Sequence, residues 1–176
     1  MRSPAKRDGY DVPNERAFRV FLAEESARLA DYDAFVASLA SAGVEGVVPA
    51  WHLWRQGTDW REVGEPAFAE PPREAWSAIV PALVVLRDEV VPLVGPVEVV
   101  SGFRTTAFNA KAGGAPGSRH RYFEAVDVVP QRRWDREALH GVLIAWWDRR
   151  GPELKLGLGL YDKIRFHVDA WKWRRW

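Results

Sequence analysis

The chain has 176 residues, of which 47% are hydrophobic and 28% are charged, a composition typical of an ordinary globular protein and a length that suits one domain. It contains no cysteine, which excludes disulfides, thiol nucleophiles and cysteine-bound zinc, so a metal ion would have to be held by histidine and carboxylate side chains. The net charge of +1, without a lysine-rich tract, argues against nucleic acid as a partner. No apolar run reaches the roughly 18 residues expected of a membrane span, and the first ten residues lack the hydrophobic segment of a signal peptide.

The charge is distributed unevenly along the chain. Up to Pro96 there are 10 lysines and arginines against 15 aspartates and glutamates, and from Val97 onward there are 15 against 9. A basic C-terminal half suits an acidic peptide, a terminal carboxylate or an anionic polymer. The alternative is a solvated face with an incidental bias.

The first half of the chain predicts helices and one long loop. Residues 16–30 and 31–42 have helical spacing of apolar residues and are expected to form a helical hairpin. Residues 47–72 are rich in Trp, Gly and Pro without a steady period, which indicates a long ordered loop and a possible wall for substrate. Residues 73–91 return to helical spacing, with Pro81 bending that helix or marking its first turns.

The second half predicts a small sheet with interleaved helices. A short helix covers residues 105–112 before a glycine-rich turn, and a longer helix capped by Asp135 is expected to run to about residue 150, where Gly151–Pro152 stops it. The predicted strands are 97–103, 125–129, 156–161 and 165–170, the last two antiparallel neighbours. This order predicts one α+β domain over residues 1–176, with a mostly antiparallel sheet and flanking helices, preceded by a helical and loop-rich part over residues 1–96.

Three residues have the types and spacing of a metal site. His120 is placed on a loop, Asp127 follows seven residues later in a short strand, and His167 lies in a second strand whose neighbours Phe166 and Val168 face the other way. Three protein ligands with one open position are what a catalytic zinc requires. The alternative is a pair of buried histidines that are satisfied by hydrogen bonds.

The other candidate features are expected to be structural. His52 belongs to a loop rich in aromatic residues and His140 to an amphipathic helix, and no ligand spacing joins them. The sequence has no His-Glu-x-x-His, Gly-x-Ser-x-Gly or phosphate-loop motif. The C-terminal segment WKWRRW, residues 171–176, either anneals the chain end to the body or forms a rim that contacts glycan or peptide.

Several segments from about residue 97 to the end occur in the order found in one known family. They are 101–105 (SGFRT), Asn109, 113–120 (GGAPGSRH) with Ala125 and Asp127, 157–161 (GLGLY) and 166–169 (FHVD). Together they resemble the D-alanyl-D-alanine carboxypeptidase and murein endopeptidase family of zinc peptidases, whose fold is shared with the hedgehog signalling domain. The resemblance makes residues 97–176 a zinc peptidase core, and residues 1–96, which carry no motif that can be placed, a lineage-specific cover for the site.

The resemblance implies Zn²⁺ as the cofactor, with His120, Asp127 and His167 as its ligands. Such a metal polarises the scissile carbonyl and lowers the pKa of its bound water to about 7, which gives hydroxide at neutral pH. The substrate implied is a peptidoglycan stem peptide, cleaved by a DD- or LD-carboxypeptidase or an endopeptidase. The alternative is a non-catalytic, zinc-stabilised module that binds cell wall or peptide.

The resemblance also implies substrate-binding residues. Arg104 matches the family arginine beside the metal, which meets a substrate carboxylate or carbonyl oxygen. It would otherwise be a structural brace for its loop. Ser118 matches the family serine that bonds substrate or orients the ligand loop, and its alternative is a plain N-cap or turn role. Tyr161 is expected to contact substrate. The compartment expected from the resemblance is the periplasm or cell envelope of a bacterium, and the chain is expected to be monomeric.

Two positions depart from the family pattern. Phe123 stands where the family usually has glycine, which predicts a differently shaped ligand loop or a filled subsite. Ile164 stands where several branches have the glutamate that serves as catalytic base. The candidate proton acceptors in this chain are Asp162, at a turn, and Asp169, which shares a strand face with His167. Asp169 has an alternative role. A hydrogen bond from the imidazole ring of a ligand histidine to Asp169 would fix the tautomer of that histidine.

Overall fold

The centre of the protein is a five-stranded sheet with the strand order β3-β4-β6-β5-β7, seen in a computed structural model that describes residues 5–7 and 9–176. The strands are β3 (Val97–Ser101), β4 (Ala125–Pro130), β5 (Gly157–Leu160), β6 (Phe166–Asp169) and β7 (Arg174–Arg175). All neighbours are antiparallel except β5 and β7, which are parallel. A separate hairpin pairs β1 (Ala5–Arg7) with β2 (Tyr10–Val12). The α+β fold with a mostly antiparallel sheet is therefore confirmed, and among the described strands only those of the hairpin and β7 were not predicted.

Alternation along the three central strands gives the sheet an apolar face and a polar face. The apolar side chains enter the main hydrophobic core and are Val126, Val128, Leu158, Phe166 and Val168. The polar side chains of the intervening positions are also buried and are Asp127, His167 and Asp169. Buried polar groups on a sheet face need partners, so this second face is where chemistry is to be sought.

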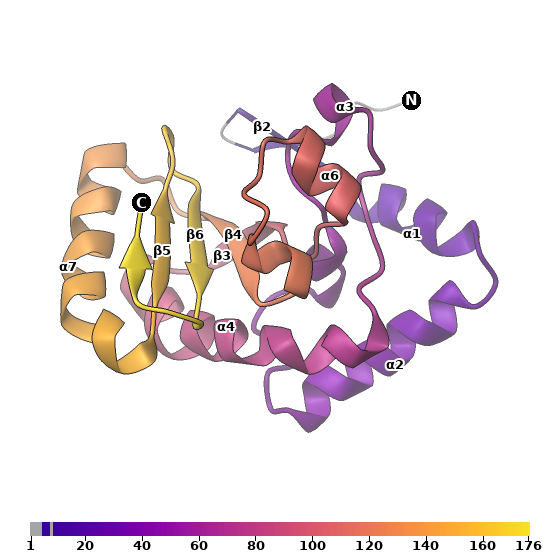
Figure 1. Ribbon diagram of the computed structural model, residues 1–176, viewed down its shortest axis with the longest axis horizontal. Coiled ribbons are helices and arrows are strands. Elements are labelled where there is room, and N and C mark those ends of the chain that lie inside the picture. The colour runs from indigo at the N-terminus through magenta and orange to yellow at the C-terminus, as the bar shows by residue number, and fades with distance from the viewer. Residues whose placement is uncertain (1–4, 8) are drawn as a thin grey trace.

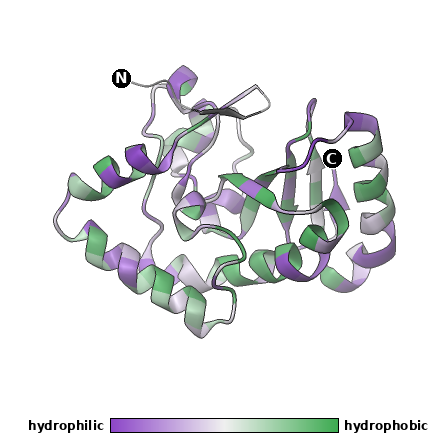
Figure 2. Cartoon of the chain, turned by 180° about the vertical axis from the view of Figure 1, so that it is seen from behind, coloured by the Kyte–Doolittle hydropathy of each residue, from purple (hydrophilic) through white to green (hydrophobic). Residues whose placement is uncertain are grey.

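Helices cover the apolar face. The rod formed by η2 (Arg73–Ile79), α4 (Val80–Val85), the π-turn η3 (Leu86–Val90) and α5 (Val91–Val94) passes behind the strands in Figure 1, and α7 (Arg136–Leu154) lies beside β5. Pro81 stands in the first turn of α4, where its missing N–H costs no helical hydrogen bond. Hydrophobic and hydrophilic bands alternate along α7 in Figure 2, as expected of a helix with one face on the core and the other in solvent.

The end of α7 was predicted wrongly. Asp135 caps the helix as expected, because its Oδ1 accepts hydrogen bonds from the N–H groups of Glu137 and Ala138. The helix then continues through Gly151 and Pro152 to Leu154. A proline in the last turn removes only one N–H donor, and the helix closes where the next residue, Lys155, adopts the left-handed conformation.

The N-terminal helices α1 (Glu15–Ala23) and α2 (Arg28–Ser41) form the predicted hairpin at the end of the molecule opposite α7 (Figure 1). The break between them falls at residues 24–27, earlier than the sequence pattern placed it. The predicted loop at 47–72 contains the short helices η1 (Ala50–Trp54) and α3 (Trp60–Val63), and η1 packs against β3. Among the described residues, no helix is long and apolar enough to cross a membrane.

Candidate metal centre and substrate pocket

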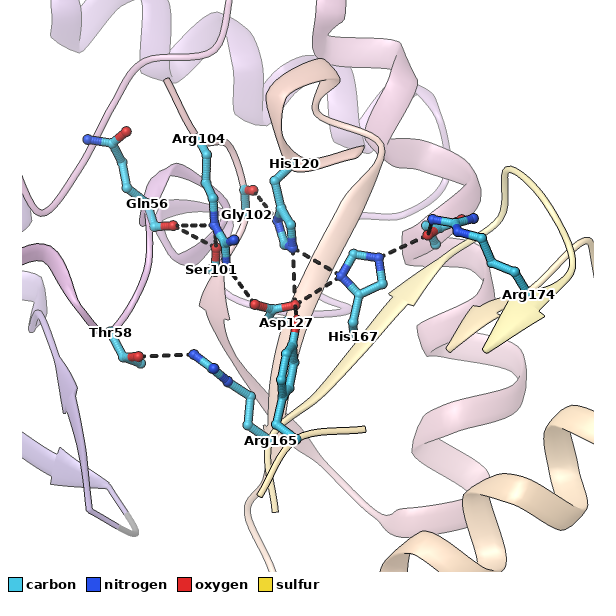
Figure 3. Close-up of polar contacts among 12 residues, drawn as sticks. Gln56, Thr58, Ser101, Gly102, Arg104, His120, Asp127, Arg165, His167 and Arg174 are labelled. Atoms are coloured by element: carbon cyan, nitrogen blue, oxygen red, sulfur yellow. Dashed lines mark hydrogen bonds and ion pairs between the residues drawn. The ribbon is translucent and has the colours of Figure 1, made fainter. Parts of the chain in front are cut away.

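His120, Asp127 and His167 meet at one point on the polar face of the sheet (Figure 3). Nε2 of His120 lies 3.1 Å from Oδ1 of Asp127 and 3.1 Å from Nδ1 of His167. Nδ1 of His167 lies 3.0 Å from Oδ1 of Asp127. The three side chains are almost fully buried, with exposed fractions of 2%, 0% and 3%. These are the three residues whose spacing and family resemblance indicate a metal site, and the structure brings them together.

Strand register explains how residues 40 apart in the sequence become neighbours. Asp127 on β4 pairs directly with His167 on β6, which in turn pairs with Gly159 on β5. His120 comes from η4 (Arg119–Tyr122), the helical turn just before β4, and its carbonyl accepts a hydrogen bond from the N–H of Arg104. The loop that carries His120 is therefore tied to the segment that leaves β3.

The hydrogen bonds of the two rings determine which nitrogen atoms carry lone pairs. Nδ1 of His120 lies 2.7 Å from the carbonyl oxygen of Gly102, so it carries the proton and leaves Nε2 as an acceptor. Nε2 of His167 lies 2.9 Å from Oδ2 of Asp169, so it is the donor there, and Nδ1 faces the cluster. Together with the Asp127 carboxylate, three acceptor atoms then point at one another, an arrangement that a cation between them stabilises.

The donor set fits zinc. Four-coordinate zinc binds histidine nitrogen and carboxylate oxygen at about 2.0–2.2 Å, which separates neighbouring ligand atoms by about 3.3–3.4 Å. The separations of 3.0 and 3.1 Å are within a few tenths of an ångström of that spacing. Small rotations of the rings are sufficient to admit the ion.

The electrostatics of the cluster favour a carboxylate anion and one neutral ring. Burial alone would raise the pKa of Asp127, but the neighbouring His120 and Arg104 outweigh it and hold that pKa well below its usual value. Burial, with the positive charge of Arg104, lowers the pKa of His120 to about 4. Burial would also lower the pKa of His167, but its hydrogen bonds to Asp127 and Asp169 raise it. In the absence of a metal, a proton on His167 relieves the repulsion among the acceptors, so proton and metal compete for this position.

Arg104 contacts the metal-ligand group and also holds its own loop in place by hydrogen bonds. Its Nη2 donates to Oδ2 of Asp127 at 2.7 Å, and its Nε donates to the Gln56 carbonyl at 3.0 Å and to Oγ of Ser101 at 2.9 Å. Gln56, which the sequence analysis did not select, is buried and also accepts from the N–H and hydroxyl of Thr105. No motif in a single sequence marks Gln56, because its role depends on the loop at 47–72 folding against β3.

A pocket of about 460 Å³ opens over the cluster, and His120 and His167 form part of its wall. Arg104, Ser118 and Tyr161 line it as well, so all three predicted substrate-binding residues face the same space. Ser118 is the N-cap residue just before η4 but makes no side-chain capping hydrogen bond, so the plain capping role does not use its hydroxyl. The buried group of three candidate ligands is therefore open to the pocket on one side. A catalytic zinc site requires such an open position, and a structural zinc site does not.

Comparison with known families supplies the decisive observation, since residues 45–151 match the family model described as Peptidase M15. The chain belongs to the Peptidase M15 family. This is a family of zinc peptidases related to the D-alanyl-D-alanine carboxypeptidases, which confirms the resemblance. No curated protein and no solved structure matches the chain. The match includes His120 and Asp127, ends before β6, and begins well before residue 97, so part of the region expected to be a lineage-specific cover lies within the M15 match.

The departure at Phe123 from the M15 pattern is accommodated by the core. Phe123 has φ 56°, the left-handed conformation that favours glycine, so the backbone at this position adopts what a glycine would allow. Its ring is fully buried against Phe35 and Phe103 and does not line the pocket. The expectation of a filled subsite is therefore wrong, because the side chain points into the hydrophobic core.

The two predicted proton acceptors differ in where they lie. Asp162 is exposed at the turn before β6 and does not line the M15 pocket. Asp169 is fully buried, and both of its oxygens are occupied: Oδ2 by His167 and Arg174, and Oδ1 by Arg174 and the N–H of Trp171. This geometry suits a residue that orients His167 and does not suit a base that takes a proton from water.

The remaining histidines lie outside the cluster. His52 packs edge-on against Trp51, and burial, together with the charge of Arg55, lowers its pKa to about 3. His140 lies on α7, with its Nε2 3.2 Å from the Lys163 carbonyl. Within the described part of the chain, the only group of histidines and carboxylates arranged to hold a metal is the one in the pocket.

Proposed function

We propose that this M15 protein holds one zinc ion through His120, Asp127 and His167 and hydrolyses peptide bonds in peptidoglycan stem peptides, as a DD- or LD-carboxypeptidase or an endopeptidase. The single observation that supports this most strongly is the set of three buried acceptor atoms within 3.1 Å of one another at the floor of an open pocket. A zinc ion bound there supplies Lewis-acid chemistry and activates water for attack on a carbonyl group at neutral pH.

The residues around the cluster divide the remaining work. Asp169 and the Gly102 carbonyl hold the two imidazole rings in the tautomers that present a lone pair to the metal. Arg104 compensates the charge of Asp127 and keeps Nη1 for substrate oxygen, because no described residue uses that nitrogen.

Tyr161 provides a neutral donor at the same place. Its hydroxyl lies 3.3 Å from Oδ1 of Asp127, and burial, together with the negative charge of Asp127, raises its pKa. The phenol therefore stays protonated at neutral pH. In the structure this O–H donates to Oδ1 of Asp127. If Oδ1 binds the metal, the O–H is released from that bond and is suited to stabilising negative charge on the carbonyl oxygen during attack.

The proton acceptor is the least conventional part of the site. Ile164 replaces the glutamate of other branches, and Asp169 is occupied by its own partners. Among the residues that line the pocket, Asp59 is the only aspartate or glutamate. Its Oδ1 accepts from the Thr58 hydroxyl at 2.8 Å, and no described residue bonds to its Oδ2. We therefore assign Asp59 as the candidate acceptor, contributed by the long loop at 47–72.

The absence of the glutamate at position 164 and the occupied oxygens of Asp169 favour a second candidate function. If Asp59 does not serve as a base, the protein is a zinc-stabilised module that binds cell-wall peptide without cleaving it. Metal analysis of the purified protein, followed by incubation with purified muropeptides and mass analysis of the products, separates the two. About one equivalent of zinc with cleavage supports the peptidase, and zinc with binding but no cleavage supports the module. A protein without zinc contradicts both.

The proposed substrate is part of the bacterial cell wall. We propose the periplasm or cell envelope as its compartment and a monomer as its working form. Fractionation of producing cells and the mass of the protein in solution test these two points directly.

A further inference from the structure

Among the described residues, Arg165 is the one arginine of the pocket wall that forms no ion pair with a carboxylate. The other arginines that line the pocket form ion pairs, which are Arg104–Asp127 at 2.7 Å, Arg119–Glu124 at 3.0 Å and Arg174–Asp169 at 2.6 Å. For Arg165, no ion pair within 4.0 Å joins it to any acidic residue in the described ranges 5–7 and 9–176. An unpaired guanidinium in a partly buried wall is a costly arrangement that an incoming anion relieves.

The contacts of Arg165 hold it in place without neutralising it. Its Nη1 donates to Oγ1 of Thr58 at 3.1 Å, and its guanidinium carbon lies 4.2 Å from the ring centre of Tyr161 and 5.5 Å from that of Tyr10. Its Nε is buried, and no described residue accepts a hydrogen bond from it. The side chain is therefore ordered by neutral partners and keeps its charge, with Nη2 bonded to no described residue and left for a ligand.

The position of Arg165 connects it to the metal cluster. It precedes His167 by two residues at the entry to β6, so the two side chains leave the backbone on the same side. Figure 3 shows the Arg165 side chain below Asp127, extending toward Thr58. A peptide whose scissile bond lies at the cluster thus places a neighbouring group against Arg165.

We propose that Arg165 binds a substrate carboxylate and makes the enzyme selective for peptides that carry one close to the cleaved bond. This inference rests on the proposed peptidase function and names its substrate class. Arg104, the arginine expected from the family to take this role, has Nε and Nη2 committed to Gln56, Ser101 and Asp127. Arg104 pairs its charge with Asp127, whereas Arg165 pairs with no described carboxylate and keeps Nη2 without a described partner, so Arg165 is the guanidinium that an incoming carboxylate neutralises.

The carboxylate has two possible sources in a stem peptide, the chain terminus and the free α-carboxylate of a γ-linked D-glutamate. Both present the same planar anion, so the test separates them with four forms of one peptide, L-Ala-γ-D-Glu-L-Lys-D-Ala-D-Ala. One form has both carboxylates, one has a terminal amide, one has D-isoglutamine in place of D-glutamate, and one has both amides. Binding is measured by calorimetry and cleavage by chromatography, with the full chain and with zinc present.

We expect the wild-type protein to bind the form with both carboxylates and to lose affinity when one specific carboxylate is amidated. Arg165→Gln should weaken binding of peptides that keep that carboxylate by about 10- to 100-fold and change binding of the doubly amidated form by less than about 2-fold. Arg165→Lys, which keeps the charge but not the planar fork, should lie between. Lys163→Gln removes a charge from the same turn, does not line the pocket, and should change none of the affinities.

The proposal is overturned if Arg165→Gln weakens all four peptides equally, or if it preserves the wild-type preference for the carboxylate form. Folding of each variant is checked by its thermal unfolding and zinc content. Should Arg165→Gln fail that check, the preference measured with Arg165→Lys decides by the same criterion, and an unchanged preference there overturns the proposal. A wild-type protein that prefers the carboxylate but cleaves none of the peptides refutes the peptidase function and leaves the recognition by Arg165 standing.

Discussion

Nε2 of His167 donates a hydrogen bond to Oδ2 of Asp169, two residues further along the same strand, over 2.9 Å. The bond fixes the ring so that Nδ1 faces Asp127 and His120. Because Arg174 grips both oxygens of Asp169, the carboxylate is itself held in place. The orientation of the His167 ring thus depends on a series of hydrogen bonds that runs through Asp169 to Arg174 in the C-terminal strand β7.

Removal of any one metal ligand should abolish zinc binding. We expect about one equivalent of zinc in the wild-type protein and little in His120→Ala, Asp127→Ala or His167→Ala, because two remaining ligands hold the ion poorly. Elemental analysis after dialysis measures this. His140→Ala, which changes a histidine on α7, should keep full zinc content. Equal zinc in the ligand variants and the wild type would mean that the metal lies elsewhere.

Asp169→Asn should weaken zinc binding without removing the chemistry. An amide is a poorer acceptor for the imidazole N–H and loses the ion pair with Arg174, so we expect affinity to fall by about 10- to 100-fold. Activity should largely return when zinc is added in excess. A titration of activity against free zinc measures both effects. Lost activity that no amount of zinc restores would instead make Asp169 the proton acceptor.

Asp59→Asn should lower the rate and leave zinc in place. The isosteric amide cannot take a proton from water, and general-base catalysis typically contributes about 10²- to 10⁴-fold. Asp162→Asn is the matched control, since Asp162 is exposed outside the pocket, and it should retain wild-type turnover. The assignment is refuted if the two variants exchange these behaviours or if neither changes kcat.

Arg104→Lys should reduce turnover while zinc content stays the same. Lysine keeps a positive charge near Asp127 but cannot at once reach that carboxylate, the Gln56 carbonyl and Ser101, as the guanidinium does. We expect kcat/KM to fall by about 10-fold or more, the cost of losing hydrogen bonds to charged groups. Kinetics equal to those of the wild type would reduce Arg104 to a brace for its loop.

Phe123→Ala should destabilise the fold and spare the pocket. Removal of a fully buried phenylalanine ring typically lowers the free energy of unfolding by about 3–5 kcal/mol, and the ring contacts Phe35 and Phe103 away from the pocket. Denaturant unfolding measures the loss. The KM of the folded variant should remain that of the wild type, and a large change in KM at unchanged stability would restore the interpretation of Phe123 as part of a subsite.

The local elements followed from the sequence because local physics decides them. The cap at Asp135, the short helix after Thr105 and the alternating strands on both sides of Asp162 each depend on neighbours within a few residues. The three metal ligands were also accessible, from their spacing and from the family resemblance. His120 lies in a turn seven residues before Asp127, and Asp127 and His167 converge because β4 and β6 pair. The end of α7 was not accessible, because Pro152 is tolerated in the last turn and the helix closes only at Lys155, which adopts the left-handed conformation.

Tertiary structure alone decided which charges are satisfied. The sequence contains Arg104, Arg165 and Arg174 with no sign of which is free, and it offers both Asp162 and Asp169 as candidates for a base, with a role in orienting a histidine as the alternative for Asp169. Only the folded chain places Asp169 between His167 and Arg174, leaves Asp162 in solvent and brings Asp59 from the distant loop into the pocket wall. The physical reason is that the state of a charged side chain depends on the groups within a few ångströms of it, and those groups come from segments far apart in the sequence.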